Sequence, residues 1–205
     1  MIFASWASRH GDTVMLHASV RAVGEIAGGP DQIHLALKSV LTSEGTLMMY
    51  ASCPRYYDEV GRGNLTAGKE REIREKLPTF DPVTARSARD NGILVEFLRT
   101  YPDSRVNCHV ARFVFWGKQP EHLTSSQPWH YAFGLGSPLD RFLALDGKIV
   151  LPGSDHDTVT FLRYIEHALG WSSSTAIPRV PMVVSRSSNV SPEWTSRGIR
   201  SFTSL

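Results

Sequence analysis

The chain has 205 residues, which is enough for one sizeable hydrophobic core and marginal for two. Hydrophobic residues make up 41% and charged residues 20% of it, and the formal net charge is +2, so the composition excludes a largely disordered chain. The charge does not suggest a nucleic-acid partner, although the isoelectric point of about 8.6 leaves one open. The two cysteines, Cys53 and Cys108, lack metal-site or disulfide-framework spacing, and no apolar run reaches about 18 residues. We therefore expect a reduced, cytoplasmic protein without a transmembrane helix.

The first fifty residues predict a βαβ unit. Residues 14–16 form a short apolar run, as in a buried strand, and residues 32–41 carry a helical stripe, with Asp31 as the expected N-cap. Residues 46–50 are apolar almost throughout, which is typical of a strand covered on both faces of a parallel sheet. The stripe consists of Ile33, Leu37, Val40 and Leu41.

A glycine-rich turn, residues 17–31, connects the first strand with this helix. Its glycines, beginning with Gly24, allow backbone N–H groups to approach a ligand closely, and Ser19 and Arg21 add side-chain donors. The following helix N-terminus adds a partial positive charge, and ligands of such sheets bind at this end of the strand. The turn therefore favours an anion such as a phosphate. An ordinary strand–helix loop remains the alternative, because neither common nucleotide-binding glycine spacing occurs.

Farther along the chain, apolar periodicity alternates with turn residues, which predicts more helices and strands around the same core. The expected helices cover residues 69–76, 91–100, 120–124, a segment opened by residues 137–139, and 157–169. The expected strands cover residues 114–116 and 148–151.

Several polar residues lie where these predicted strands and loops end. His109, in the segment RVNCHVARF, is the residue type suited to proton transfer near neutral pH, although a histidine without such a role is the more common case. Asp157 and Thr158 follow a predicted strand, where ligands bind, and Asp157 could equally be a helix N-cap. Tyr50 ends the second strand, and Glu166 lies two turns along the last helix.

The composition changes from Trp171 onward, where serine and arginine dominate and Glu193 is the only acidic residue. Residues 177–184 could form one more strand, interrupted by prolines, and nothing after Ser185 argues for packed structure. We therefore expect one α/β domain over residues 1–184 and a disordered tail over residues 185–205.

Five blocks of the chain, in this order, resemble the aminoglycoside 3-N-acetyltransferases: MLHASVRAVGEIAGG, GTLMMYAS, FDPVTARSARDNGILVEFLRTYP, GLGSPLDRFLALDGKIVLPGS and DTVTFLRYIEH. The resemblance covers roughly residues 9–184 and implies the α/β fold of that family, a mixed, largely parallel sheet flanked by helices. It implies acetyl transfer from acetyl-CoA, without a metal, to the 3-amino group of the deoxystreptamine ring of an aminoglycoside antibiotic. Such a transfer would confer antibiotic resistance, and the resemblance admits a homodimer.

The resemblance also implies roles for particular positions. His109 stands where the family has its catalytic histidine, which makes it the expected general base, and Thr158 is an expected donor to the oxyanion. The positions expected to bind acetyl-CoA are Ser19, Val20, Arg21, Gly24, Ser137 and Arg141. The drug is a polycation, so acidic side chains should face it. The positions expected to bind it are Tyr50, Asp81, Asp157 and Glu166.

Three departures from the family pattern leave other functions open. Val110 follows His109 where the family has a proline, Arg163 replaces a frequent histidine, and a tail that resembles a truncation or a shifted reading frame replaces an acidic continuation. A non-catalytic CoA- or nucleotide-binding remnant is therefore an alternative to the enzyme. A basic-tailed nucleic-acid binder is a third hypothesis, and steep salt dependence would identify it. It rests on Arg179, Arg186, Arg197 and Arg200.

Overall fold

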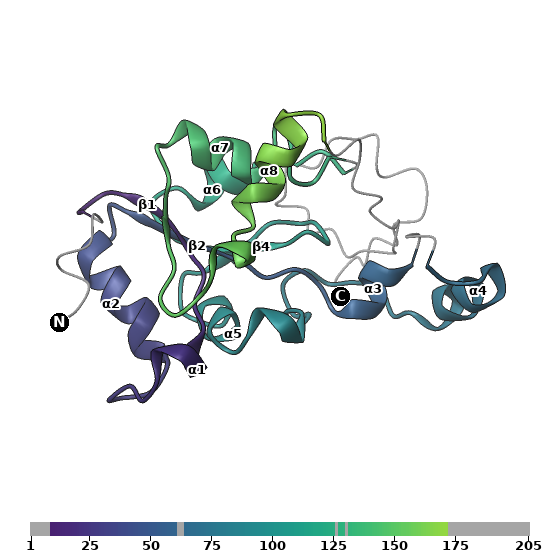
Figure 1. The fold of residues 1–205 in the computed structure, drawn as a ribbon, viewed down its shortest axis with the longest axis horizontal. Coiled ribbons are helices and arrows are strands. Elements are labelled where there is room, and N and C mark those ends of the chain that lie inside the picture. Colours follow the sequence, from purple (N-terminus) through teal and green to yellow (C-terminus); the bar gives the residue numbers. More distant parts are fainter. Residues whose placement is uncertain (1–8, 61–63, 126, 130, 172–205) are drawn as a thin grey trace, which may run out of the picture.

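The structure is a computed structural model that describes residues 9–60, 64–125, 127–129 and 131–171. Five strands form one sheet in the order β3-β4-β2-β1-β5, and helices cover both of its faces (Figure 1). The strands are β1 (Thr13–Leu16), β2 (Thr46–Tyr50), β3 (Arg105–Val106), β4 (Phe113–Gly117) and β5 (Lys148–Val150). The strand predicted over residues 177–184 and the tail predicted over residues 185–205 lie outside the described residues.

The sheet is mixed. β1 pairs in parallel with both β2 and β5, whereas β4 pairs antiparallel with β2 and β3. The predicted βαβ unit is confirmed, because α2 (Asp31–Leu41) connects β1 with its parallel neighbour β2. The mixed α/β fold class is confirmed with it.

Alternation along the strands divides the core into two layers. Val14 and Leu16 of β1 pack with α2 and α5 (Leu94–Arg99), while Met15 between them packs with the helices on the opposite face. That second layer consists of α6 (Pro120–Thr124), α7 (Pro138–Ala144) and α8 (Phe161–Ala168). Figure 1 shows the two layers on opposite sides of the sheet. Because both faces are covered, β1 and β2 need apolar residues at nearly every position.

The remaining elements are short or lie at the periphery. They are α1 (Val20–Val23), α3 (Arg55–Glu59), α4 (Ala67–Lys76) and the 3₁₀ turns η2 (Arg89–Asn91) and η3 (His156–Thr158). α4 extends away from the sheet and buries no residue (Figure 1). Thr66 caps its N-terminus, and ion pairs such as Arg74–Glu70, at 2.7 Å, join successive turns, so local interactions support a helix that the core does not.

The last described helix differs from its prediction. α8 begins at Phe161 rather than at Asp157, because residues 156–158 form η3, in which the Thr158 hydroxyl donates to the Asp155 carbonyl at 2.7 Å. Asp157 is therefore not an N-cap. This local hydrogen bond competes with helix formation in the way that is usual for threonine.

The buried side of α8 is formed by an aromatic residue and a histidine rather than by its aliphatic residues. Leu162 and Ile165 are exposed, whereas Tyr164 and His167 are buried against the core. The Tyr164 hydroxyl donates to the Asp140 carboxylate at 2.8 Å, which satisfies its polar atom inside the contact with α7.

Two helix starts are corrected as well. The helix predicted from residue 91 begins at Leu94, after the 3₁₀ turn η2. Asp31 is the first residue of α2 and not its N-cap, a position that Pro30 occupies. The Asp31 carboxylate instead lies 2.8 Å from Nε2 of His34.

The buried face of α2 carries two titratable side chains. His34 is 0% exposed, and Nζ of Lys38 lies 3.1 Å from the centroid of the Tyr101 ring and 4.8 Å from that of Trp116. Nζ has no hydrogen-bond acceptor among the described residues. Burial lowers the pKa of Lys38 to about 7, although the negative charge of Asp31 acts to raise it. Burial also lowers the pKa of His34.

These shifts predict a pH-dependent stability. The folded pKa of Lys38, about 7, lies below the value of about 10.4 for an unfolded lysine, so between these values the unfolded state binds more protons. The free energy of unfolding should therefore rise with pH across this window, by up to about 1.4 kcal/mol per pH unit. Urea denaturation at several pH values measures the slope.

Lys38→Met should remove most of this slope, because the variant has no amine to titrate. Lys118→Met is the matched control, since Lys118 pairs with Glu44 at the surface, and it should keep the slope of the parent. An equal slope in the Lys38→Met variant and the parent would contradict the assignment.

Candidate functional site

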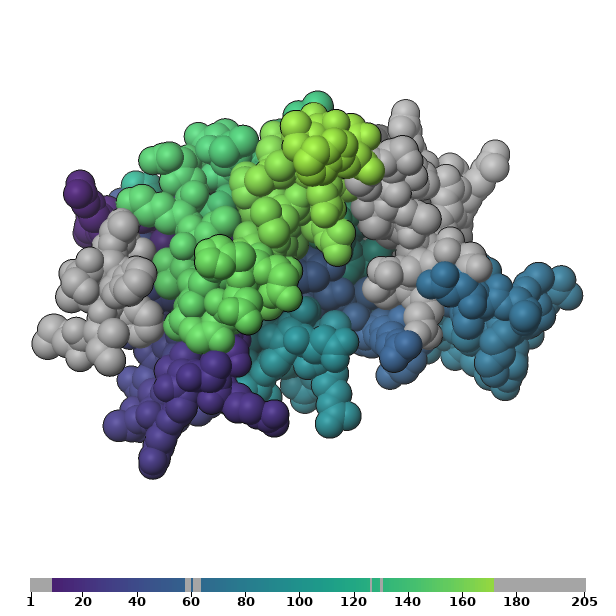
Figure 2. All heavy atoms as spheres, viewed as in Figure 1, coloured from purple at the N-terminus to yellow at the C-terminus, as the bar shows by residue number. Residues whose placement is uncertain are grey.

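The carboxyl ends of β1 and β2 open into a cleft of about 1130 Å³. In Figure 2 it lies between the yellow-green segment of α8 and the purple and teal segments of α1 and α5. The sheet contributes Leu16, Met49 and Tyr50, and His17 follows β1. The walls come from α1, from residues 90–93 and from residues 157–167. The cleft is therefore where a ligand of a parallel β1–β2 pair is expected.

The turn after β1 is held rigidly against the segment after β5. The backbone N–H groups of His17 and Ser19 donate to the carbonyls of Val150 and Pro152, at 3.0 and 3.1 Å. A Cβ added at Gly153, whose φ is +67°, would lie 2.9 Å from the Ser19 carbonyl oxygen. Only a glycine allows this approach, so the geometry of the turn depends on a residue far along the chain.

The expected glycine turn contains the short helix α1. Ser19 caps it, with its hydroxyl accepting from the Ala22 N–H at 3.3 Å, and Gly24 ends it with a φ of +89°. Ser19, Val20 and Arg21 line the cleft, and the side chain of Arg21 is exposed and forms no ion pair within the described ranges. This part of the cleft thus offers a free guanidinium and a hydroxyl.

The same cleft also carries carboxylates. Asp157 and Glu166 line it, as expected, and Asp90 joins them from the segment before α5. Arg163, also in the cleft, lies 3.0 Å from the Glu166 carboxylate, so one of the three acids has a cationic partner within the protein. A ligand with more than one amine would find anionic partners here.

Two neutral groups complete this region. The Tyr50 ring is held by Phe113 and Phe133, whose ring centroids lie 5.1 and 5.7 Å away. Thr158 lines the cleft, with its hydroxyl donated to the Asp155 carbonyl. Tyr50 therefore provides a fixed surface, while Thr158 must exchange its hydrogen bond before its hydroxyl can donate to a ligand.

His17, which follows β1, also lines the cleft. Its Nε2 is buried and has no hydrogen-bond partner in the described part of the chain. Burial lowers the pKa of His17 to about 4, so the ring is neutral at pH 7, and the same burial makes it a weak base.

His109 lies outside the residues that line the cleft. It is 1% exposed, its Nδ1 accepts from the Ala111 N–H at 2.9 Å, and its Nε2 lies 3.3 Å from the Trp129 carbonyl oxygen. An Nδ1 that accepts places the proton of a neutral ring on Nε2, so this hydrogen-bond pattern engages both nitrogens. A base role for His109 requires the ring to leave Trp129.

Four other expected site residues also lie outside the lining of this cleft: Gly24, Asp81, Ser137 and Arg141. The Ser137 hydroxyl caps α7, accepting from the N–H groups of Leu139 and Asp140. The Asp81 carboxylate accepts from the Val83 N–H at 2.9 Å and the Thr84 hydroxyl at 2.6 Å. Burial lowers the pKa of Arg141, against the charge of Asp140. Ser137 and Asp81 thus have structural partners within the fold.

The segment Asp90–Ile93 is a wall of the cleft that the sequence did not reveal. The tripeptide Asp90-Asn91-Gly92 is a turn signal, but no spacing relates it to β1 or β2. Within the described residues there is no group of three metal-ligating side chains and no helix long and apolar enough to span a membrane.

Comparison with known proteins gives the chain a family. The model of the aminoglycoside 3-N-acetyltransferase family matches residues 15–203. The chain is 39% identical over 166 residues to aminoglycoside N(3)-acetyltransferase III of Pseudomonas aeruginosa, which covers 80% of this chain and 60% of that protein. It thus spans well under two thirds of the length of this relative.

Two solved structures share the fold. AAC-IIIb, in a binary complex with CoASH, superposes with a TM-score of 0.72 at 38% identity, over 80% of this chain and 61% of that one. AAC-VIa bound to sisomicin superposes with a TM-score of 0.70 at 35% identity, over 78% of this chain and 59% of that one.

The close approach at Gly153 predicts a measurable cost for a methyl group there. Gly153→Ala should lower the free energy of unfolding by about 1–2 kcal/mol for the left-handed backbone and by more for the collision with Ser19. Gly170→Ala is the control, because Gly170 has a φ of +70° and nothing within 4 Å of an added Cβ. If both variants lose the same free energy of unfolding in urea denaturation, the turn must move aside to accommodate the added methyl group at little cost.

Proposed function

The chain belongs to the aminoglycoside 3-N-acetyltransferase family, and on that premise we propose that it transfers an acetyl group from acetyl-CoA to the 3-amino group of the deoxystreptamine ring of an aminoglycoside. The observation that carries the proposal is one cleft lined both by Ser19 and Arg21 and by the carboxylates of Asp90, Asp157 and Glu166. The proposed product is an acetylated, inactive antibiotic. The proposal places the enzyme in the cytoplasm and admits a homodimer.

The proposed place of acetyl-CoA is the turn after β1. AAC-IIIb has a structure with CoASH, and this chain offers Ser19, Val20 and Arg21 to the cleft, on a turn that Gly153 holds by backbone contact. Arg21 is suited to a phosphate, because a guanidinium forms charge-assisted hydrogen bonds with phosphate oxygens. Acetyl-CoA, when bound, supplies the acetyl thioester. We propose that Gly24, Ser137 and Arg141 support the site from outside the lining residues.

The proposed place of the aminoglycoside is the acidic part of the cleft. AAC-VIa has a structure with sisomicin, and the amines of such a ligand are cationic near neutral pH. Asp157 and Glu166 are the proposed partners of those amines, with Tyr50 as a fixed wall. Asp81 lies outside the lining of the cleft, with its carboxylate accepting from Val83 and Thr84, so it can join them only if the loop that carries it moves. Holding both substrates in one cleft supplies much of the rate advantage of a direct transfer.

The transfer needs a neutral base that takes a proton from the attacking amine. His109 is the proposed base because it stands where the family has its catalytic histidine, and Thr158 is the proposed donor to the oxyanion. The competing candidate is His17, whose ring is neutral, lines the cleft and has an unpaired Nε2. A ring that already accepts and donates hydrogen bonds, as His109 does, is a poor base until it moves.

This engagement of His109 also favours the second candidate function, a CoA-binding protein without turnover. Both functions predict CoA binding at the turn after β1. Only the enzyme predicts the release of free thiol from acetyl-CoA in the presence of an aminoglycoside such as sisomicin.

We expect Arg21→Ala to weaken CoA binding by about 1–3 kcal/mol, the usual contribution of a hydrogen bond between charged groups. Isothermal titration calorimetry measures the affinity. Arg71→Ala, on the exposed α4, is the matched control and should bind CoA like the parent. Unchanged affinity in Arg21→Ala would move the phosphate site away from this turn.

If His109 is the base, His109→Ala should reduce turnover by roughly 10²–10⁴-fold and leave CoA affinity unchanged, because the imidazole acts on the amine. His17→Ala is the parallel variant, and turnover is followed by thiol release. Full activity in His109→Ala together with a comparable loss in His17→Ala would transfer the role to His17.

A further inference from the structure

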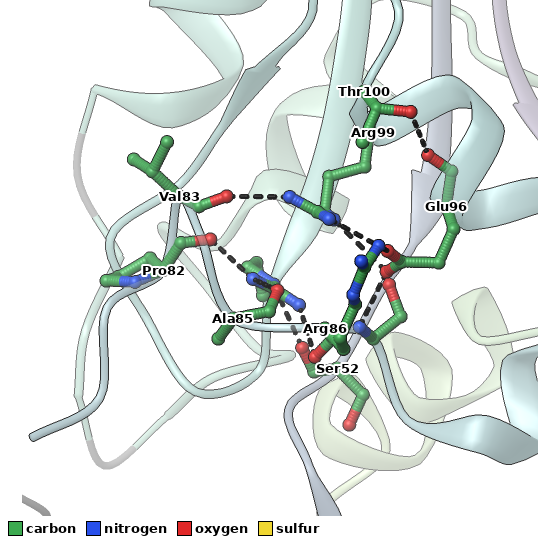
Figure 3. Close-up of polar contacts among 10 residues, drawn as sticks. Ser52, Pro82, Val83, Ala85, Arg86, Glu96, Arg99 and Thr100 are labelled. Atoms are coloured by element: carbon green, nitrogen blue, oxygen red, sulfur yellow. Dashed lines mark hydrogen bonds and ion pairs between the residues drawn. The ribbon is translucent and has the colours of Figure 1, made fainter. Parts of the chain in front are cut away.

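A fully buried arginine fastens the loop before α5 to the end of β2. Arg112 is 0% exposed, and its guanidinium donates to the carbonyls of Ser52 at 3.0 Å, Ala85 at 2.7 Å, Arg86 at 3.0 Å, and Pro82. Figure 3 shows Ser52, from the end of β2, near Ala85 and Arg86 of the loop, whose carbonyls accept these hydrogen bonds. One side chain thus joins residues 82–86 to the end of β2.

Glu96, on the first turn of α5, closes the same loop from its other side. Its carboxylate accepts from the Ser87 N–H at 2.7 Å and from Arg86 and Arg99 at 3.0 and 2.8 Å. Arg99 in turn donates to the Val83 carbonyl at 2.7 Å (Figure 3). The backbone groups on both sides of residue 85 are therefore hydrogen-bonded by side chains, although this loop is neither a helix nor a strand.

The loop over residues 82–87 continues directly into a wall of the cleft. Asp90 and Asn91 follow it, and the Asn91 amide donates to the Ala51 carbonyl at 2.7 Å, next to Tyr50 at the end of β2. The Ala88 N–H donates to the same carbonyl at 3.2 Å. The side chain of Asp90 itself is exposed. Its position in the cleft therefore depends on the backbone that carries it.

We propose that Arg112 and Glu96 are positioning residues that hold the wall Asp90–Ile93, and with it the Asp90 carboxylate, in register with the end of β2 for a cationic ligand. The proposal rests on the proposed function for the identity of that ligand, an aminoglycoside. Neither residue lines the cleft, so each acts through the wall alone.

The chemistry of the two side chains explains why they suit this task. A guanidinium presents several donors in a fixed plane, so carbonyls from two segments are held at fixed relative positions. Arg112 stays protonated near neutral pH, because burial lowers its pKa only to about 10. A lysine at the same position keeps the charge but has no planar fork, and Gln in place of Glu96 keeps the shape but loses the charge.

Calorimetry with sisomicin and with CoA tests the proposal on the full chain. Arg112→Lys and Glu96→Gln should each weaken sisomicin binding by about tenfold or more, since a misplaced group costs up to about 10²-fold, and change CoA affinity by less than about twofold. In an Asp90→Asn background, Glu96→Gln should add little, because it acts through the carboxylate already removed. Lys148→Met is the matched control, because the Lys148–Asp12 pair lies at the opposite end of β1 and β5.

Several results would overturn the proposal. An equal loss of sisomicin affinity in Lys148→Met would mean that general destabilisation is the cause, and full additivity of Glu96→Gln with Asp90→Asn would mean that Glu96 acts elsewhere. If Arg112→Lys fails to fold, the calorimetry of Glu96→Gln is the test of the proposal. Binding of CoA but not of sisomicin by the parent would refute the proposed function instead.

In that event, amide hydrogen exchange of residues 88–93 decides the positioning role by itself. Exchange should accelerate in Glu96→Gln and not in Lys148→Met, and unchanged exchange in Glu96→Gln would overturn the proposal.

Discussion

The parallel pairing of β1 with both β2 and β5 is the constraint on which the rest of the structure depends. Parallel strands place their carboxyl ends at one edge of a sheet, and here three such ends are adjacent. The turn after β1, the end of β2 and the loop after β5 are brought together only by this pairing. The cleft that they line is thus a consequence of the sheet, and a different strand order would separate its walls.

Two of those walls are fixed by contacts between backbone segments rather than by regular elements. Near α1, the absence of a side chain at Gly153 lets two loops touch, and their N–H and carbonyl groups pair. Near α5, the side chains of Arg112 and Glu96 take up the polar backbone groups of a loop that has no strand partner. Buried backbone polar groups must be paired, and these are two solutions to that requirement.

Side chains of both charges line the cleft, and this is what suits it to the two unlike substrates proposed for it. Arg21 has no ion-pair partner in the described ranges, and the acids Asp90, Asp157 and Glu166 line the same cleft. Arg163 reduces the negative charge of the cleft by pairing with Glu166. The proposed substrates carry opposite charges, a polyanionic CoA and a polycationic drug, and each has groups of opposite charge in this lining.

The sequence by itself determined the local and periodic features. The βαβ unit followed from an apolar strand, a helical stripe and a second apolar strand, and the ordered family blocks identified the fold class. Several cleft residues, including Ser19, Arg21, Tyr50 and Thr158, were also found from their places after predicted strands, since ligands gather at carboxyl ends. Where local hydrogen bonding competed with periodicity, as at η3, the predicted helix start was wrong by several residues.

Only the tertiary structure decided which distant residues meet. The antiparallel addition of β4, the burial of His109 beside Trp129 and the wall at Asp90 involve partners 20 or more positions apart, for which a single sequence carries no periodic signal. Arg112 shows the difference most directly: in the sequence it is one arginine among 22 basic residues, and in the fold it is a fully buried side chain that binds four carbonyls. Burial with complete pairing is a property of packing, and it arises only when the segments that supply the partners have come together.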